Sequence, residues 1–212
     1  MLLTIETCTD TSTLGIVHEG AVLAEMAFPS RHTLVSRLLL RLDWLLGEAG
    51  TSKDKLEGIA VSLGPGSFTG VRIGAAAAKV LAPALGIPLV GVSTLQAIAW
   101  PFRQLSGHTL VPVINARRGQ VYTAQFSGEQ RLTPDAVLSP EPFTATLEGI
   151  SPILLGALDG LAEGFNPGGY PIIRALVTPH ALAALAGERL ARGESDDPLT
   201  LAPVYLRAPA DR

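Results

Sequence analysis

The sequence has a single cysteine, Cys8, among its 212 residues, and it contains no run of basic residues. One cysteine excludes an internal disulfide and fits a reducing compartment. A net charge of −3 without a basic run argues against a strong stand-alone nucleic-acid binder. Secreted disulfide scaffolds and basic nucleic-acid-binding modules are therefore not the expected classes.

The sequence also lacks a recognisable leader and a convincing membrane span. Glu6 interrupts the first apolar run too early for a signal peptide. The longest apolar region, residues 71–92, carries Arg72, Lys79 and two prolines, which makes it a poor membrane span. A length of 212 residues is enough for one large domain or two small ones, and an apolar share of 47% allows a sizeable core. We expect a soluble, cytoplasmic protein without a membrane contact.

A glycine-rich stretch, Gly-Pro-Gly-Ser-Phe-Thr-Gly at residues 64–70, joins a predicted buried strand to a predicted alanine-rich helix. Glycines such as Gly66 adopt backbone angles closed to other residues, and Ser67 or Thr69 can cap the helix. A helix that starts behind such a turn can bind an anion with its unpaired amides. The stretch is therefore a candidate phosphate site.

Three known motifs nevertheless fail to fit this stretch. It lacks the Gly-Lys-Ser or Gly-Lys-Thr ending of a P-loop. Thr69 stands where a dinucleotide fingerprint has its third glycine, and Ser67 lacks the flanking glycines of a nucleophile elbow. The favoured interpretation is a tight strand-to-helix turn whose small residues let another surface come close.

The predicted order of elements indicates an α/β protein with an internal duplication. Three antiparallel strands come first, at residues 1–7, 13–18 and 21–28, with Glu19-Gly20 as a hairpin turn. Helices and strands then alternate, at residues 32–48, 59–63, 68–85, 87–92 and 93–102. This βββαβαβα unit forms a first lobe, residues 1–106.

The second lobe, residues 107–212, repeats the unit in degraded form. Strands predicted at 109–114 and 120–126 resemble the first two strands of the chain. A strand at 152–157 and a helix at 179–192 follow after a polar, proline-dotted stretch. A duplicated βββαβαβα unit is the pattern of the actin, sugar-kinase and heat-shock ATPase (ASKHA) fold, so we predict a two-lobed actin-like fold.

The two helices of the first lobe have unusual surfaces. The helix at 32–48 has apolar residues on two faces, although a helix on a sheet needs one apolar stripe. The surplus indicates burial against a partner chain or between two layers of the same chain. The helix at 68–85 is rich in alanine and glycine, and small side chains allow close helix packing. Its Arg72 and Lys79 form either a solvated stripe or the rim of a contact between chains.

Four segments of the sequence, residues 61–74, 86–95, 114–122 and 203–207, resemble the signature stretches of the TsaB (YeaZ) family. The resemblance spans nearly the whole chain. It implies a non-catalytic partner of TsaD, the enzyme that transfers threonylcarbamoyl to an adenosine of tRNA. It also implies a TsaE-like ATPase as a third member, homodimers when the chain is alone, and tRNA contact only within the complex.

The resemblance implies a docking interface on the first two helices of the first lobe. The residues expected there are His32, Leu34, Val35, Leu38, Leu39, Leu42, Phe68, Arg72, Ile73, Ala76, Lys79 and Val80. A residual nucleotide or phosphate site would comprise Glu6, Thr7, Gly66, Ser67 and Asn115.

Catalysis by the chain itself is not expected. TsaD-like enzymes hold a metal through His-x-x-x-His on their first helix, whereas this sequence has His32 and then Ser36, a poor metal site. Two aspartates of the family pattern are replaced by Glu6 and Asn115, which weakens a tight ATP site. We therefore expect no metal, no cofactor and no catalytic residue.

Two other functions stay open from the residues. A small kinase or ATPase of the same fold would need acidic metal ligands in both lobes, where this chain offers Glu6 and Asn115. A protease would need a nucleophile with a nearby base, and no histidine has an evident serine partner. The Arg117-Arg118 pair is interpreted as a solvated hairpin turn rather than an RNA contact, because the net charge is acidic.

Overall fold

The computed structural model describes residues 1–30, 34–157 and 169–206, which form two compact units. The first unit comprises Met1–Thr94 and Val177–Val204, and the second comprises Leu95–Leu176 with the residues from Tyr205 onward. These ranges differ from the predicted lobes, 1–106 and 107–212. The chain leaves the first unit earlier than predicted and returns to it at Val177.

The first unit contains a five-stranded mixed sheet with the order β3-β2-β1-β4-β5. Its strands are β1 (Leu2–Glu6), β2 (Thr11–His18), β3 (Ala21–Pro29), β4 (Gly58–Ser62) and β5 (Leu89–Val92). The pairs β1–β2 and β2–β3 are antiparallel, whereas β1–β4 and β4–β5 are parallel. The predicted order of the first unit is confirmed by this topology.

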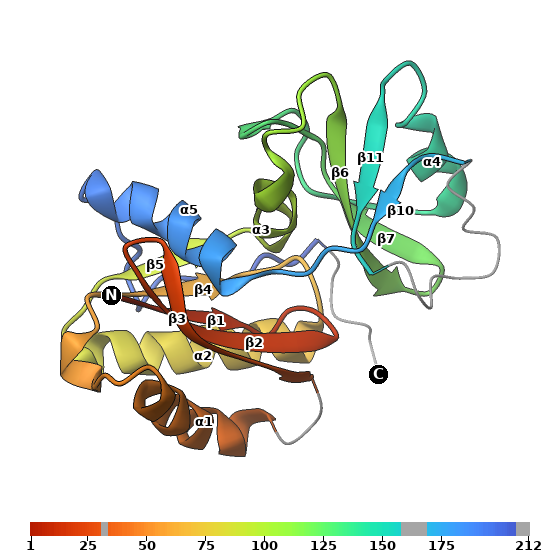
Figure 1. Ribbon diagram of the computed structural model, residues 1–212. Coiled ribbons are helices and arrows are strands. Elements are labelled where there is room, and N and C mark those ends of the chain that lie inside the picture. Colours follow the sequence, from red (N-terminus) through yellow and green to blue (C-terminus); the bar gives the residue numbers. More distant parts are fainter. Residues whose placement is uncertain (31–33, 158–168, 207–212) are drawn as a thin grey trace. The chain divides into compact units, whose positions relative to one another are not determined.

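Helices cover both faces of this sheet (Figure 1). Helices α1 (Leu34–Glu48) and α2 (Phe68–Leu85) lie on one face, and α5 (Pro179–Ala191) lies on the other; a short 3₁₀ helix, η1, spans Lys53–Lys55. Between the sheet and the α1–α2 layer lies a core of aliphatic side chains. It includes Leu3, Ile5, Leu14, Ile16, Leu38, Leu42, Leu45, Leu46, Ile59 and Val61. Burial of this apolar set is the main stabilising contribution to the unit.

Helix α2 has the predicted bounds, and both of its ends are capped. Ser67 accepts a hydrogen bond from the Gly70 amide at the start, and Gly86 adopts the left-handed conformation at the end. Within the described residues, α2 alone is long and apolar enough to cross a membrane by length and composition. Its packing against β4 accounts for that composition, because small residues such as Ala75 and Ala78 are buried there.

The second unit repeats the strand order of the first, with β10-β7-β6-β11-β12 in a seven-stranded sheet. Its strands are β6 (Thr109–Arg117), β7 (Gln120–Thr123), β8 (Phe126–Ser127), β9 (Gln130–Arg131), β10 (Ala136–Leu138), β11 (Pro152–Leu155) and β12 (Ile172–Ile173). Its helices are α3 (Thr94–Ala99), the 3₁₀ helix η2 (Trp100–Phe102) and α4 (Pro140–Ala145).

The match between the two strand orders confirms the predicted duplication. In both strand orders the first three strands pair in antiparallel fashion, and the last two add to them in parallel. The second copy is reduced: α4 has six residues at the chain position where the first unit has the fifteen-residue α1. The prediction of a degraded second lobe is confirmed.

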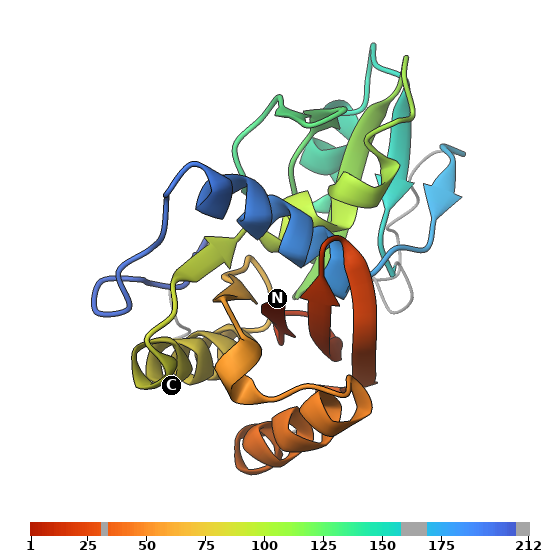
Figure 2. The same ribbon diagram turned by 60° about the vertical axis from the view of Figure 1, so that its left-hand side comes forward.

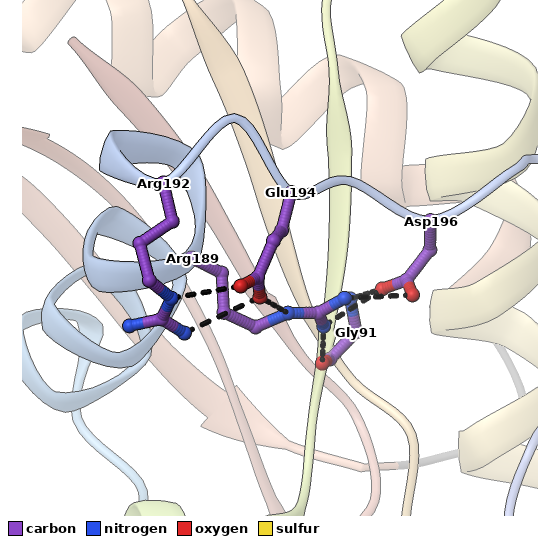
Figure 3. A network of polar contacts seen from close by, with 5 residues as sticks. All are labelled: Gly91, Arg189, Arg192, Glu194 and Asp196. Atoms are coloured by element: carbon purple, nitrogen blue, oxygen red, sulfur yellow. Dashed lines mark hydrogen bonds and ion pairs between the residues drawn. The ribbon is translucent and has the colours of Figure 1, made fainter.

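After α5, the chain runs back along the edge of β5 (Figure 2), and we call residues 194–204 the strap. The Asp196 amide donates to the Leu89 carbonyl at 2.7 Å, and the Gly91 amide donates to Asp196 Oδ2 at 2.7 Å. Arg189 of α5 donates to both carboxylate oxygens of Asp196 and to the Gly91 carbonyl (Figure 3). The strap thereby covers an edge strand whose backbone groups would otherwise face solvent.

Asp196 should be the residue that fixes the strap. Burial opposes ionisation of Asp196, but hydrogen bonds from Arg189 and Gly91 outweigh it and lower the pKa below the usual 3.8. Ionised Asp196 therefore stabilises the folded protein above pH 3.8, and this stabilisation is lost as the pH falls through the lowered pKa. We expect Asp196→Ala to lower the unfolding free energy at pH 7 by about 2 kcal/mol, measured by urea denaturation. Asp196→Asn keeps an acceptor for the Gly91 amide, so it should lose less of the unfolding free energy. Equal stability of the wild type and the two variants would show that Asp196 does not hold the strap.

Candidate functional site

The glycine-rich turn before α2 is occupied by the chain's own backbone. The turn after β1, residues 7–9, lies against it: the Ser67 amide donates to the Cys8 carbonyl at 2.7 Å, and the Thr7 hydroxyl donates to the Gly70 carbonyl at 2.7 Å. The Ser67 hydroxyl oxygen accepts a hydrogen bond from the Gly70 amide. Two amides that could receive a phosphate, those of Ser67 and Gly70, thus already bind protein.

Two glycines make this close approach possible. A Cβ built on Gly66 would lie well inside 3.0 Å of the Cys8 carbonyl oxygen, and one on Gly70 would lie equally close to the Thr7 carbonyl oxygen. Real Cβ atoms essentially never come that near to another atom. The favoured interpretation of the stretch, a tight turn whose small residues admit another surface, is confirmed.

Glu6 stands at the end of β1 and is fully buried. Its Oε1 accepts from the Cys8 amide at 2.6 Å and from the Thr9 amide at 2.8 Å, so the carboxyl group holds the turn after β1. Its Oε2 has no hydrogen-bond partner within the described residues. Burial raises the pKa of Glu6 above the usual 4.5, although the hydrogen bonds from the Thr9 and Cys8 amides favour the charged form.

The neighbouring thiol has no features of a nucleophile. Cys8 is buried, with its sulfur 3.1 Å from the Ser62 hydroxyl oxygen. Burial and, secondarily, the Glu6 carboxyl raise the pKa of the Cys8 thiol far above its usual range. Because the thiolate is the reactive form, Cys8 is a structural residue of the core.

The structure brings together four of the five residues predicted for a nucleotide or phosphate site. Glu6, Thr7, Gly66 and Ser67 surround the turn after β1 in the first unit. Asn115 belongs to β6 of the second unit, where its side-chain oxygen accepts from the Arg117 amide at 2.8 Å. Across the residues that the structure describes, no three His, Cys, Asp or Glu side chains gather as metal ligands.

One histidine does have a serine partner that the sequence did not indicate. His108 Nδ1 lies 3.1 Å from Ser151 Oγ, and both side chains are exposed. In the part of the chain that the structure describes, Ser151 is the only hydrogen-bond partner of His108, so no carboxylate orients the imidazole. A catalytic serine needs a base that is itself oriented by a third group, and this pair lacks one.

The helices α1 and α2 expose apolar side chains away from the sheet. On α1, Leu40 is 68% and Trp44 is 53% exposed; on α2, Val80 is 68% and Phe68 is 39% exposed. Ala76 is exposed as well, and the Arg72 guanidinium stacks on the Phe68 ring at 3.8 Å. These large apolar side chains on two helices of one layer form the surface that we call the α1–α2 face.

Part of the predicted docking interface needs correction. Leu38 and Leu42 belong to the core beneath α1, so they are not on the surface that a partner could contact. Ile73 is half-buried against the same core, and Lys79 binds the strap. His32 lies outside the described residues, as do the side chains of Leu34, Val35 and Leu39.

The sequence did contain a signal for Leu40 and Trp44, which the predicted docking interface did not include. Leu40 and Trp44 are four apart and therefore lie on one side of a helix. They follow neither of the two apolar stripes from which the interface was predicted. Apolar residues on a third side of the helix were the sign in the sequence that this helix exposes apolar surface.

Known proteins resemble both the sequence and the fold. The family model described as TsaD, tRNA N6-adenosine threonylcarbamoyltransferase, matches residues 29–145, more than half of the chain. The TsaB proteins, named for tRNA threonylcarbamoyladenosine biosynthesis, of Escherichia coli and Bacillus subtilis are 36% and 35% identical over 66% and 64% of this chain. The solved structure of YeaZ from Pseudomonas aeruginosa superimposes with a TM-score of 0.79 and 29% identity, covering 97% of this chain and 99% of that one.

The chain belongs to the TsaB (YeaZ) family. The fold is the actin-like, ASKHA-type fold predicted from the order of elements. The matched region spans 63% of the length of the E. coli protein and 59% of that of the B. subtilis protein. The relatives named TsaB carry names that refer to tRNA threonylcarbamoyladenosine biosynthesis.

Proposed function

We propose that the chain is a non-catalytic assembly subunit of the machinery that forms threonylcarbamoyladenosine in tRNA. In this proposal it docks a TsaD-type transferase through the α1–α2 face. The supporting observation is the exposure of Leu40, Trp44, Phe68 and Val80 on two helices of one layer. Exposed apolar surface of this kind is typical of a protein–protein contact.

The kind of partner is suggested by the family match. The transferase family model covers residues 29–145, which include α1 and α2, so a transferase chain carries corresponding helices. Two related chains can then pair through the same helices, and the chain alone would form a homodimer in the same way. The complete assembly would include a TsaE-like ATPase, contact tRNA only as a complex, and reside in the cytoplasm.

The non-catalytic part of the proposal is supported by the filled turn. The Ser67 amide at the start of α2 donates to the Cys8 carbonyl, the Gly70 amide donates to the Ser67 hydroxyl, and Glu6 is fully buried. A kinase or ATPase of this fold would need that turn open to a nucleotide. ATP titration of the purified chain tests this part of the proposal directly, because low-micromolar binding would contradict it.

Val80→Glu should abolish pairing with the transferase while leaving the chain folded. A charge at the centre of an apolar contact costs more than about 2 kcal/mol, which is a loss of at least thirtyfold in affinity. Leu132→Glu is the matched control, because Leu132 is 47% exposed and lies in the second unit. Calorimetric titration with the transferase of the same organism measures both variants. Wild-type affinity for Val80→Glu, or no pairing of the wild-type chain, would contradict the docking proposal.

A further inference from the structure

We infer that the hairpin between β6 and β7 contacts the phosphate backbone of tRNA bound to the complex, through Arg118 at its tip. This inference rests on the proposed function, in which the chain belongs to a complex that acts on tRNA. It adds a contact in the second unit, whereas the α1–α2 face belongs to the first.

A tight turn joins β6 to β7, which are both labelled in Figure 1. Arg117 pairs with Gln120 across the hairpin. The two residues between them, Arg118 and Gly119, have φ angles of 53° and 72°. Positive φ at both central residues is the pattern of a type I′ turn, which favours Asn-Gly or Asp-Gly. Arginine therefore stands where a shorter polar residue would suit the turn better.

The residue before the turn is strained as well. Arg117 has a φ of 61°, although a type I′ turn needs positive φ only at its two central residues. The Asn115 side-chain oxygen accepts from the Arg117 amide at 2.8 Å, and the strand register shifts between these two residues. Non-glycine residues rarely adopt this backbone region, and such outliers concentrate at functional sites. Two successive arginines there indicate a purpose other than turn formation.

The hairpin carries positive charge and no carboxylate. Residues 109–123 contain Arg117 and Arg118 but no Asp or Glu, and both arginines are exposed. The strand beside β7, β10 (Ala136–Leu138), is uncharged. The tip is therefore a local cationic site on a chain whose net charge is negative.

Arg118 differs from two other arginines of the second unit. Arg103 pairs with Glu129, and Arg131 pairs with Asp135. Among the residues that the structure describes, no acidic side chain forms an ion pair with Arg118. Its planar guanidinium matches the geometry of phosphate oxygens and is available to an external anion.

The surroundings of Arg118 favour a phosphate backbone over a protein surface. The centre of a protein–protein interface is apolar and is enriched in aromatic residues. Residues 109–123 include no exposed large apolar side chain, in contrast to the α1–α2 face. Contacts to a nucleic-acid backbone are made largely by arginine and lysine and need no apolar surface. Because a complex that modifies tRNA necessarily meets phosphate, we assign the contact to tRNA.

The acidic net charge is compatible with this contact. A charge of −3 argues against strong RNA binding by the chain alone, and the predicted hairpin turn at Arg117-Arg118 is confirmed. Within the complex, the hairpin only has to add a phosphate contact to those that the partner makes. We therefore expect the contribution of Arg118 to be measurable in the assembled complex and weak in the isolated chain.

The test compares Arg118→Asn with a matched variant, Glu19→Asn, in the complex with the transferase. Glu19 holds the same turn position in the β2–β3 hairpin, with a φ of 49°, so both substitutions relieve the same backbone strain. Both variants should melt at or above the wild-type temperature, because asparagine suits this position. A melting temperature of Arg118→Asn clearly below that of the wild type would show that the arginine supports the turn, which contradicts the inference.

Only the arginine variant should change tRNA binding. Arg118→Asn should weaken binding of the complex to an unmodified tRNA transcript about fivefold and should reduce the slope of log K against log salt by about one. Arg118→Lys keeps the charge and should keep the wild-type slope, and Glu19→Asn should bind tRNA no more weakly than the wild type. Fluorescence anisotropy titrations at several salt concentrations measure both quantities.

The outcomes separate this inference from the proposed function. Unchanged tRNA binding by Arg118→Asn, with normal pairing to the transferase, would overturn the phosphate contact and leave the docking proposal intact. If Arg118→Asn instead pairs more weakly with the transferase in calorimetric titrations without tRNA, the hairpin contacts protein and the inference is wrong. If the wild-type chain does not pair with the transferase, both fail.

Discussion

Gly70→Ala should prevent stable folding of the first unit or lower its unfolding free energy by roughly 3 kcal/mol or more, because overpacking and two lost hydrogen bonds add together. The new methyl group would meet the Thr7 carbonyl oxygen at a distance that real Cβ atoms do not reach. The turn after β1 would have to move away, which breaks the bonds from Thr7 to Gly70 and from Ser67 to Cys8. Thermal unfolding followed by circular dichroism measures the loss.

Gly47→Ala is the matched control for this substitution. Gly47 also lies within a helix, α1, but a Cβ there would have no neighbour within 4 Å. Alanine is the better helix former, so this variant should be neutral or more stable by up to about 1 kcal/mol. If Gly70→Ala is as stable as Gly47→Ala, the turn after β1 does not pack against α2 as described.

The contrast between these glycines shows what the sequence could and could not predict. A run of glycines between a strand and a helix predicts close approach, and the structure confirms it. Which surface approaches was not predictable, because residues 7–9 lie about sixty positions away in the chain and carry no local sign of the contact. The same turn could have received a phosphate in a chain with a more open β1–β2 connection.

The order and type of elements were predictable because they depend on local patterns. Periodicity and turn residues predicted the three opening strands, the exact bounds of α2 and the duplicated unit. The return of α5 and the strap to the first unit was not predicted, because long-range packing of α5 and the Arg189–Asp196 pair decide it.

The docking surface was predictable only in part. Excess apolar residues on the first helix indicated a second contact, but helical spacing alone did not say which stripe faces the sheet. The structure places Leu38 and Leu42 inward and Leu40 and Trp44 outward. Variants at Leu38 would therefore report on folding rather than on docking, which is why Val80 is the better position for a test.

Glu6→Gln should stabilise the protein increasingly as the pH rises. The folded-state pKa of Glu6 is raised above 4.5 by burial, so its favourable contribution is fully present below that pH and is lost as the pH rises through the folded pKa. Glutamine does not ionise, and its Oε1 can still accept from the Cys8 and Thr9 amides. Urea denaturation between pH 4.5 and pH 8 should show wild-type stability falling relative to the variant.

Two further variants serve as comparisons in this experiment. Glu6→Leu removes the acceptor for the Cys8 and Thr9 amides, and it should be less stable than Glu6→Gln by about 2–3 kcal/mol at every pH, because neither side chain ionises. Glu48→Gln alters an exposed carboxylate at the end of α1 and should follow the wild type. If Glu6→Gln is instead less stable than the wild type at pH 8, the turn after β1 requires a charged carboxylate. The buried group would then be an anion held by the backbone amides of Cys8 and Thr9.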